Sequence, residues 1–378
     1  MSLLLWLAMV ACAERISAPS TDGCDQRFAD DRVLRSMCRR VMSHRFVSPR
    51  GPLCALKVDA KDAVTVATLN VGLLPSVARL DDRRALFRDR FGEAMRAEGV
   101  DVLLIQELFE RKDRRMFEGV ARDAGYEIVH ETSRSGLAIV FKASRFEVIR
   151  ATSTRLPGDV TALGGFTRRV MWLEVIDRRS GETYVFGNTH ASPILRPYWG
   201  NMRSAQITRM SEALQVALAD CGNRAKRECM LVLGGDFNLS NSHDWDGRTP
   251  WGALGPRDRR RRQRLLRWIQ WDEFLYEVLS RTATEALAVS TAEFMTEHAR
   301  NKVLMTSKGA AEEPNRRVDL LFLVRGALGN SRLVFDDAHG DLSFSDHFGF
   351  AASVSAEGDC DGRLAGEPPG QRAERTEE

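Results

Sequence analysis

Apolar runs of strand length, separated by polar turns, fill most of the chain from residue 63 onward. Aliphatic and β-branched residues dominate each run, which is typical of strands in a sheet core. The predicted strands are VTVATLNVG (64–72), VDVLLIQELF (100–109), SGLAIVFK (135–142), FTRRVMWLEV (166–175), ETYVFGNTHAS (182–192), CMLVLGGDFN (229–238), RVDLLFLV (317–324) and HFGFAASV (347–354).

Stretches with helical periodicity separate several of these strands. The clearest is Asn201–Leu218, where Ile207, Met210 and Leu214 recur on one face. Shorter helices are predicted over Arg84–Glu98 and Arg114–Ala124, and another follows the basic run RDRRRRQR. Strands mixed with helices over this length predict an α/β or α+β sandwich, with two sheets at the centre and helices outside.

The first 12 residues are predicted to be an export signal. The apolar run from Leu3 to Cys12 is far shorter than the ~20 residues that cross a bilayer. MVAC resembles the bacterial lipobox, whose cysteine is lipidated after cleavage. We therefore expect an exported protein, either lipid-anchored in the bacterial envelope or secreted.

Three further segments follow the signal. Residues 13–60 form a prelude in which apolar residues at helical spacing predict one helix before the breaker SPRGP. Residues 61–355 hold the predicted strands and form the main domain. Residues 356–378 are polar and rich in Pro and Gly, so this tail is expected to be disordered.

Cysteine content agrees with export. Of the seven cysteines, six remain after Cys12, and six permit three disulfides with 15 connectivities. Cys221 and Cys229 flank a short polar turn and are the first pair we expect. The formal charge is only +3, so any interaction with nucleic acid must depend on a local basic patch.

Carboxylate, amide or imidazole groups stand at the ends of the predicted strands. One polar residue at such a place is usually a turn or a cap, but here the pattern recurs on most strands. Strand ends that face one way create one crevice, so we expect a common site. Its candidates are Asn70, Glu107, His190, Asp236, Asn238, Asp319, Asp346 and His347.

The motifs LNVG, IQE, NTH, GGDFN, RVD and SDH occur in the order found in the endonuclease/exonuclease/phosphatase superfamily, which residues 63–354 resemble. The resemblance implies an α/β fold, a four-layer α/β-sandwich with two central mixed sheets flanked by helices. It also implies phosphoester cleavage with a divalent cation, commonly Mg²⁺, with Mn²⁺ or Ca²⁺ as alternatives.

The chemistry of phosphodiester hydrolysis suggests a role for each candidate. Magnesium prefers oxygen ligands, so Glu107 is the first expected metal ligand, with Asn70 beside it and Asp346 as a second position or support. His347 fits the base that activates water, and the resemblance implies that Asp319 fixes its tautomer.

The remaining candidates would act on the phosphate. Asp236 and Asn238 would address the attacking water, the phosphate or the leaving oxygen. His190 would contact the phosphate or protonate the leaving oxygen. Within the superfamily, pancreatic-type deoxyribonucleases and neutral sphingomyelinases have a histidine at this position and apurinic nucleases lack one. At His190 the chain therefore resembles the first two branches.

LNVGLLP, QELFE and the pair Arg203 and Gln206 favour the sphingomyelinase branch, so a phospholipid headgroup hydrolase is our first hypothesis. Two features depart from that branch. The segment RGALGNSRLVFDDAHGDLSF is short and nearly free of aromatic residues, and Gly164-Gly165 stands where the family has Lys-Gly. An exported deoxyribonuclease-like endonuclease is the alternative. A non-catalytic binding lipoprotein is a third reading, against which the complete set of polar residues argues.

Two features would serve either substrate. Tyr198 and Trp199 would enter a lipid interface or stack on a base, and Arg203 is a further candidate for substrate binding. The basic run would meet anionic lipid or a phosphate backbone; packed aromatics and a solvated charge run are the structural alternatives. We expect a monomer with peripheral membrane contact and no obligate protein partner.

Overall fold

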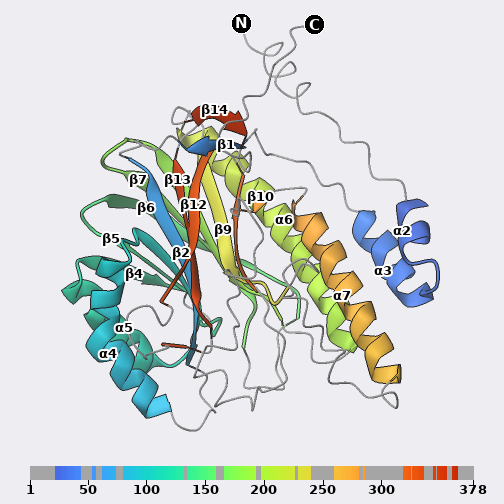
Figure 1. Ribbon diagram of the computed structural model, residues 1–378. Helices are drawn as coiled ribbons and strands as arrows, with labels where there is room; N and C mark the ends of the chain where they lie inside the picture. The colour runs from blue at the N-terminus through green and yellow to red at the C-terminus, as the bar shows by residue number, and fades with distance from the viewer. Residues whose placement is uncertain are drawn as a thin grey trace, which may run out of the picture.

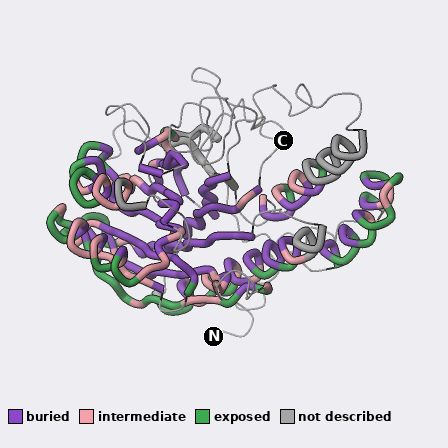
Figure 2. The backbone as a smooth tube through the Cα atoms, turned by 90° about the horizontal axis from the view of Figure 1, so that it is seen from below, coloured by how far each residue is buried: buried purple, intermediate pink, exposed green. Residues whose placement is uncertain are grey.

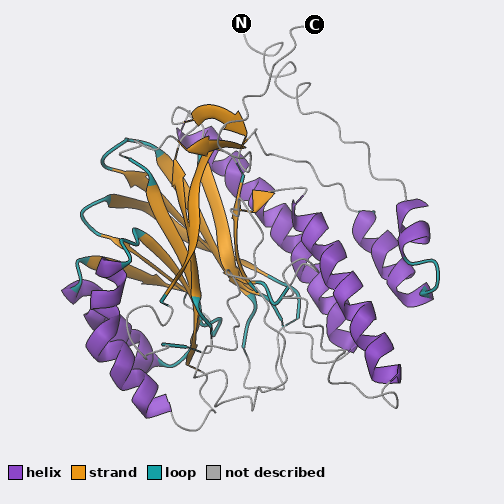
Figure 3. Cartoon of the chain, in the orientation of Figure 1, coloured by secondary structure: helices purple, strands orange, loops and turns teal. Residues whose placement is uncertain are grey.

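The computed structural model describes residues 22–43, 53–56, 62–73, 80–131, 134–158, 166–192, 197–225, 229–239, 259–280, 284–285, 318–324, 326–335, 344–345, 347–355 and 360–364. Within these ranges, two β-sheets lie face to face and helices cover the outer face of each (Figures 1 and 3). The predicted four-layer α/β-sandwich is confirmed.

In the described residues, the larger sheet has eight strands. These are β1 (Leu53–Leu56), β2 (Val64–Leu73), β3 (Val102–Leu108), β4 (Tyr126–His130), β5 (Ala138–Lys142), β12 (Gly326–Val334), β13 (Gly349–Ser355) and β14 (Cys360–Leu364). Their order is β14-β1-β12-β13-β2-β3-β5-β4. At its centre β2 pairs in parallel with β3 and antiparallel with β13, so the sheet is mixed.

The smaller sheet has six strands within the part of the chain that the structure describes. These are β6 (Phe146–Arg155), β7 (Arg169–Asp177), β8 (Thr183–His190), β9 (Met230–Asp236), β10 (Thr284–Glu285) and β11 (Asp319–Leu323). Their order is β10-β11-β9-β8-β7-β6. Every residue of β8, β9 and β11 is buried because both faces of these strands are covered, and this is why the sequences of β9 and β11 are mostly apolar.

Three apolar layers hold the sandwich together, and Figure 2 shows the buried strands at its centre. Leu104, Phe186 and Leu321 belong to the layer between the sheets. Phe87 and Phe91 belong to the layer that joins the larger sheet to α4 (Leu80–Ala97) and α5 (Arg111–Asp123). The third layer joins the smaller sheet to α6 (Pro197–Ala225) and α7 (Arg259–Ser280).

The described part of the prelude, 22–43 and 53–56, contains two helices, α2 (Asp22–Arg27) and α3 (Arg32–Met42), so the prediction of one helix is wrong. The side chain of Asp31 accepts hydrogen bonds from the backbone N–H groups of Val33 and Leu34 and thereby caps a new helix. A disulfide between Cys24 and Cys38 joins α2 to α3.

The prelude packs on the outer helices. The ring of Phe28 lies 5.9 Å from the ring centroids of both Trp271 and Phe274 on α7. Arg27 forms an ion pair with Glu277 on the same helix, at 2.6 Å. The prelude therefore packs against α7.

The predicted boundaries of the main domain, 61 and 355, are too narrow. β1 lies within the predicted prelude and β14 within the predicted disordered tail, yet they pair with each other and β1 also pairs with β12. An edge strand such as β14 pairs through its backbone and needs little apolar side-chain surface, so composition alone misplaced it. The rest of the tail, 356–359 and 365–378, lies outside the described residues, as does the predicted signal, 1–12.

The predicted Cys221–Cys229 disulfide is present and joins the end of α6 to the start of β9. None of the helices in the described ranges combines the length and apolarity needed to cross a bilayer.

Candidate active site

Three candidate residues meet across neighbouring strands of the smaller sheet. His190 ends β8 and pairs in register with Asp236, which ends the parallel strand β9. Asp236 pairs in turn with Asp319, the first residue of the antiparallel strand β11. The sheet therefore places an imidazole and two carboxylates in one row, as the pattern of polar strand ends predicts.

His347 joins this row from the larger sheet, just before β13. Its Nδ1 lies 2.7 Å from Oδ2 of Asp319, and both side chains are buried. A carboxylate on Nδ1 favours the tautomer that carries its proton there, which leaves Nε2 as the basic nitrogen. The predicted His347–Asp319 pair is thus present in the structure, with the geometry of a base and its orienting carboxylate.

Asp236 is held by amides from two sides. Nδ2 of Asn70, on β2, donates to Oδ2 of Asp236 at 3.0 Å, and the backbone N–H of Asn238 donates to Oδ1 at 2.8 Å. Burial and the nearby Asp319 carboxylate raise the pKa of Asp236 to about 6, although His347 and the two hydrogen bonds oppose the shift. Buried negative charge has therefore accumulated at this end of the sheets.

The two glycines before Asp236 are required by close packing. A Cβ on Gly235, whose φ is +143°, would lie 1.9 Å from the carbonyl oxygen of Thr189. A Cβ on Gly234 would lie 2.4 Å from Leu321 and 2.6 Å from Leu104, on the facing sheet. Gly-Gly thus allows β8, β9 and the larger sheet to converge where the carboxylates emerge.

His190 lies between the carboxylates of both sheets. Its Nε2 is 3.5 Å from Oδ2 of Asp236 and 3.8 Å from Oε1 of Glu107, the latter on β3. Burial, with the positive charges of Arg168 and His347, lowers the pKa of His190 well below its usual value. A lowered pKa favours the neutral form of His190, and the negative charge of a bound phosphate would favour its protonation.

Glu107 and Asn238 adopt left-handed backbone conformations, with φ of +61° and +50°. Such values are uncommon for residues other than glycine and cluster at functional sites, where the surrounding structure maintains them. At Asn238 the side-chain amide donates to the carbonyl oxygen of Ala191 at 3.1 Å, which ties the end of β9 to the end of β8.

The donor set fits a hard divalent cation. One ligand atom from each of Asp236, Asp319 and His347 lies within 4.8 Å of the others, and Glu107 approaches the same region through His190. Oδ2 of Asp319 contacts His347, and the assignment of Glu107 and Asn70 as metal ligands stays a prediction. Oxygen donors of this kind suit Mg²⁺, Mn²⁺ or Ca²⁺.

Three predicted site residues are not defined by the structure. Asp346, proposed as a metal ligand, lies outside the described residues. Tyr198 and Trp199 fall in the first turn of α6, where the backbone is described and the side chains are not. Their roles remain predictions.

Arg203 corrects a prediction. We expected it to bind substrate, but only 1% of it is exposed, and its guanidinium donates to the carbonyl oxygen of Asn238 and forms an ion pair with Asp272 on α7. Arg203 therefore positions the end of β9 from behind, because its charge is used within the protein. Gln206, one turn further, donates to Ser192 Oγ at 3.1 Å and to the carbonyl of Pro157 at 2.8 Å.

An inter-sheet amide network beneath the site was missed by sequence reasoning. Nε2 of Gln106, on β3, donates to Oδ1 of Asn188, on β8, at 2.7 Å. Nδ2 of Asn188 donates to the carbonyl oxygens of Ile105 and Ala138 in the larger sheet, at 2.7 and 2.8 Å. Buried amides within IQE and NTH, in otherwise apolar strands, were the available signal. Together these bonds fix the two sheets in register directly below Glu107 and His190.

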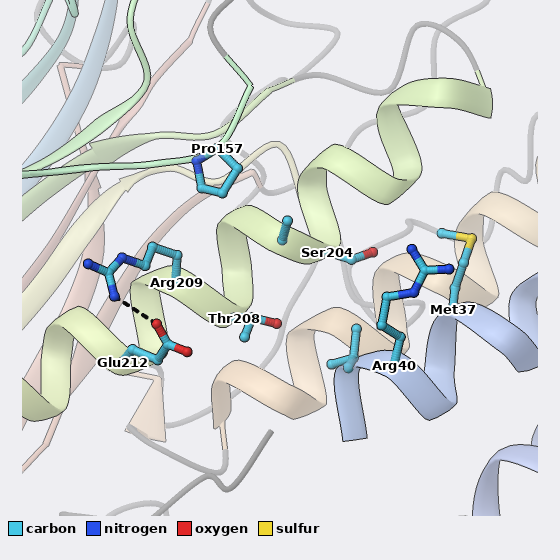
Figure 4. A pocket seen from close by; sticks show the side chains of 9 residues that line it. Met37, Arg40, Pro157, Ser204, Thr208, Arg209 and Glu212 are labelled. Atoms are coloured by element: carbon cyan, nitrogen blue, oxygen red, sulfur yellow. Dashed lines mark hydrogen bonds and ion pairs between the residues drawn. The ribbon is translucent and has the colours of Figure 1, made fainter. Parts of the chain in front are cut away.

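A separate hollow of about 300 Å³ lies between α3 and α6 (Figure 4). Met37 and Arg40 of the prelude line one side, and Ser204 and Thr208 of α6 line the other. None of the carboxylates or histidines of the crevice contributes to this hollow, so it is distinct from the candidate active site.

Comparison with known proteins agrees with this geometry. An endonuclease/exonuclease/phosphatase from Bacteroides vulgatus has a similar structure, with a TM-score of 0.53 and 15% identity over 79% of this chain and 100% of that one. TDP2 from D. rerio, solved with a single-strand DNA product, gives a TM-score of 0.52 and 15% identity over 78% of this chain and 100% of that one. Beta toxin from Staphylococcus aureus gives a TM-score of 0.53 and 13% identity over 76% of this chain and 99% of that one. At these identities the likeness shows the fold alone.

No curated protein sequence matches the chain. The sequence profile of the Endonuclease/Exonuclease/phosphatase family, however, matches residues 67–347, which include most of both sheets and every described candidate residue of the crevice. The chain belongs to the endonuclease/exonuclease/phosphatase family.

Proposed function

We propose that the protein is a metal-dependent phosphodiesterase that hydrolyses a phosphodiester with an activated water. The observation that carries this proposal is the buried His347–Asp319 pair, with a contact of 2.7 Å, beside Asp236 and within the electrostatic reach of His190. A base with an orienting carboxylate, next to groups that can address a phosphate, is what water-activated hydrolysis requires.

The residues divide the reaction between them. Nε2 of His347 takes a proton from the attacking water, and Asp319 stabilises the imidazolium that forms. Asp236 and Asn238, fixed by Asn70 and by the Ala191 carbonyl, orient the water and the phosphate. His190 contacts the phosphate from the other side and donates a proton toward the leaving oxygen.

A divalent cation, held by Glu107 and Asn70, would neutralise charge on the phosphoryl oxygens. The crevice needs such a charge because the carboxylates of Glu107, Asp236 and Asp319 would otherwise repel the substrate. The same proposal assigns Asp346 to a second metal position or to the support of the site.

For the substrate, a phospholipid headgroup is our first choice. LNVGLLP, QELFE and the Arg203–Gln206 spacing, which resemble the sphingomyelinase branch, support it. Tyr198 and Trp199 begin α6, shortly after His190, where aromatic side chains would reach a headgroup boundary.

A nuclease is the second candidate. Its support is the basic start of α7, whose first turn has no acidic residue and begins Arg-Arg-Arg-Arg. Basic residues in the first turn of a helix are unfavourable because of the helix dipole. An interaction with a phosphate backbone would offset this cost. The same fold is present in the D. rerio TDP2 that holds single-strand DNA.

We also propose that the protein is exported. The disulfides Cys24–Cys38 and Cys221–Cys229 support this, because structural disulfides persist mainly in oxidising compartments. Thiol titration of denatured protein from the native envelope, without reductant, tests this proposal. Free thiols at these four cysteines would contradict it.

The deciding experiment is a parallel assay of the purified protein on sphingomyelin, phosphatidylcholine, plasmid DNA and the chromogenic bis(p-nitrophenyl) phosphate. Hydrolysis of any of them, abolished by chelator, supports the phosphodiesterase. The preferred natural substrate then separates the lipid and nuclease candidates. Absence of hydrolysis on all four with added Mg²⁺, Mn²⁺ or Ca²⁺ would contradict the proposal.

A further inference from the structure

One cation in the crevice has no assigned role. Arg168 lies at the end of the chain segment that leads into β7, where its carbonyl accepts a hydrogen bond from the backbone N–H of Leu156 at 2.8 Å. Its side chain is nevertheless turned inward, because only 8% of the residue is exposed. A guanidinium is almost never buried to this extent unless something pairs with it.

The protein partners of Arg168 use only part of its hydrogen-bonding capacity. One terminal nitrogen donates to the carbonyl oxygen of His190 at 3.2 Å. Nε is buried and, within the part of the chain that the structure describes, finds no partner. The side chain offers five N–H donors in a planar fork, so a donor is left over beside the residue that ends β8.

The charges around Arg168 are those of the active site. Burial lowers the pKa of Arg168, while the Glu107 and Asp236 carboxylates act in the opposite direction. In turn, the positive charge of Arg168 helps to keep His190 neutral. Arg168 thus lies within the field of the two carboxylates and the imidazole, yet it forms no direct ion pair with any residue in the described ranges.

We propose that Arg168 binds a non-bridging oxygen of the scissile phosphate. An unpaired donor in a dry site, held by the carbonyl of His190, is already oriented for an anion and needs no rearrangement to bind it. Arginine suits this task, because its fork matches the oxygens of a phosphate and its charge persists when buried. This inference rests on the proposed phosphodiesterase function and adds a catalytic residue to it.

Arg169 provides a matched control. It is the next residue and has the same charge, and its Nε also lacks a hydrogen-bond partner in the described residues. Arg169 differs in having a carboxylate beside it, because Nε lies 3.6 Å from Glu131, and NH1 donates to Ser153 Oγ at 3.0 Å. Loss of charge at Arg169 should therefore change the general electrostatics of this edge without removing a donor from the crevice.

The test measures binding of inorganic phosphate by isothermal titration calorimetry, with full-length protein and a constant concentration of Mg²⁺. In Arg168→Gln the dissociation constant should rise about 10- to 100-fold, the loss expected for a hydrogen bond to a charged group. In Arg169→Gln it should stay within about twofold of the wild type. An Arg168→Gln constant that is also within about twofold would overturn the inference.

Arg168→Lys covers the case in which Arg168→Gln does not fold. Lysine keeps the charge and a donor for the His190 carbonyl, but it lacks the planar fork. We expect phosphate affinity to fall about fivefold or more in this variant. A folded Arg168→Lys protein with unchanged affinity would contradict the proposal.

Separate assays of bis(p-nitrophenyl) phosphate hydrolysis keep the two proposals apart. A wild-type protein that binds phosphate through Arg168 but hydrolyses no diester contradicts the proposed function and supports the anion site. Diester hydrolysis by a wild-type protein whose phosphate affinity does not depend on Arg168 contradicts only the anion site.

Discussion

The buried guanidinium of Arg203 joins helix α6 to the carbonyl oxygen of Asn238, and its other end forms an ion pair with Asp272 on α7. Two outer helices are thereby connected to the last residue of the GGDFN motif. Asn238 in turn fixes Asp236 through its backbone N–H and Ala191 through its side chain. The geometry of the crevice therefore depends on helices that contribute no reacting group.

Arg203→Gln is expected to destabilise the protein by about 3 kcal/mol, because it removes a buried cation that pairs with the partly buried carboxylate of Asp272. Activity should also fall, since Asn238 loses its support. Urea unfolding measures the first effect. Arg209→Gln is the control, because Arg209 lies on the same helix and forms an exposed pair with Glu212; its effect should be within about 0.5 kcal/mol. Equal stability of the two variants would contradict this role for Arg203.

Glu107→Gln should make activity dependent on much higher metal concentrations, because the change keeps the size of the side chain and removes the charge of a ligand. Chelator should abolish wild-type activity, and added Mg²⁺ should restore it. The readout is the rate of diester hydrolysis against metal concentration. Glu110→Gln is the control, since Glu110 is three residues further on and pairs with Arg84 and Lys112. Full activity in excess chelator would refute the metal requirement.

His347 and Asp319 should behave as one unit. His347→Ala should lower kcat/KM by about 10²- to 10⁴-fold. Asp319→Ala should cause a loss of similar order, because it leaves the imidazole without its orienting carboxylate. The double variant should then lose little more than His347→Ala alone, since groups that act together are not additive.

His130→Ala is the control for this pair. His130 lies on β4, with Nε2 3.1 Å from Oε1 of Glu118, and contributes no group to the crevice, so its removal should leave the rate nearly unchanged. Losses that multiply in the His347→Ala/Asp319→Ala protein would show that the two residues act independently, contrary to the contact in the structure.

How much of this arrangement the sequence predicts depends on the range of the interactions involved. β9 was predictable because Leu231, Val232 and Leu233 are buried on both faces, and the polar residue after such a strand marks the crevice. β6 was missed because most of its residues are partly or fully exposed and its sequence, FEVIRATSTR, contains few apolar positions. An edge strand of this kind depends on its neighbour β7 for its structure.

The site residues also fall into those that the local sequence identifies and those that depend on distant parts of the chain. Polar strand ends identified Asp236, His190 and Asp319, because the strand direction alone brings them together. The burial of Arg168 and Arg203 could not be predicted, because nothing local distinguishes a buried arginine from an exposed one. Their contacts are with groups distant in sequence, the carbonyl oxygen of His190 for Arg168 and the carboxylate of Asp272 for Arg203.

Tyr126 should make stability fall at alkaline pH. Burial, with the nearby charge of Asp101, raises its pKa to about 12, and its hydroxyl donates to the carbonyl of Val100 at 2.7 Å. Because the folded pKa exceeds the unfolded value of about 10, the folded state holds the proton more tightly. This contribution is complete below about pH 10 and is lost as the pH rises toward 12, by about 2 to 3 kcal/mol in total.

The measurement for Tyr126 is the free energy of unfolding of the wild type and Tyr126→Phe, from about pH 9 to pH 11. The variant removes the titrating group, so the advantage of the wild type should shrink as the pH rises. Other groups that titrate in this range affect both proteins and cancel in the difference. A constant difference over the range would show that the Tyr126 pKa is not raised by folding.

The substrate prediction separates the lipid and nuclease candidates. If a phospholipid is cleaved, the products should include a phosphorylated alcohol such as phosphocholine. Replacing both Tyr198 and Trp199 with Ala should then reduce activity on vesicles far more than on a soluble short-chain analogue, because only vesicles require apolar side chains at the headgroup boundary. If DNA is cleaved, activity should fall steeply with salt. Neutralising Arg259 to Arg262 should make that dependence shallower, because fewer counterions are released per binding event. Strong plasmid nicking with no release of phosphocholine from vesicles would reject the lipid hypothesis, and the reverse result would reject the nuclease.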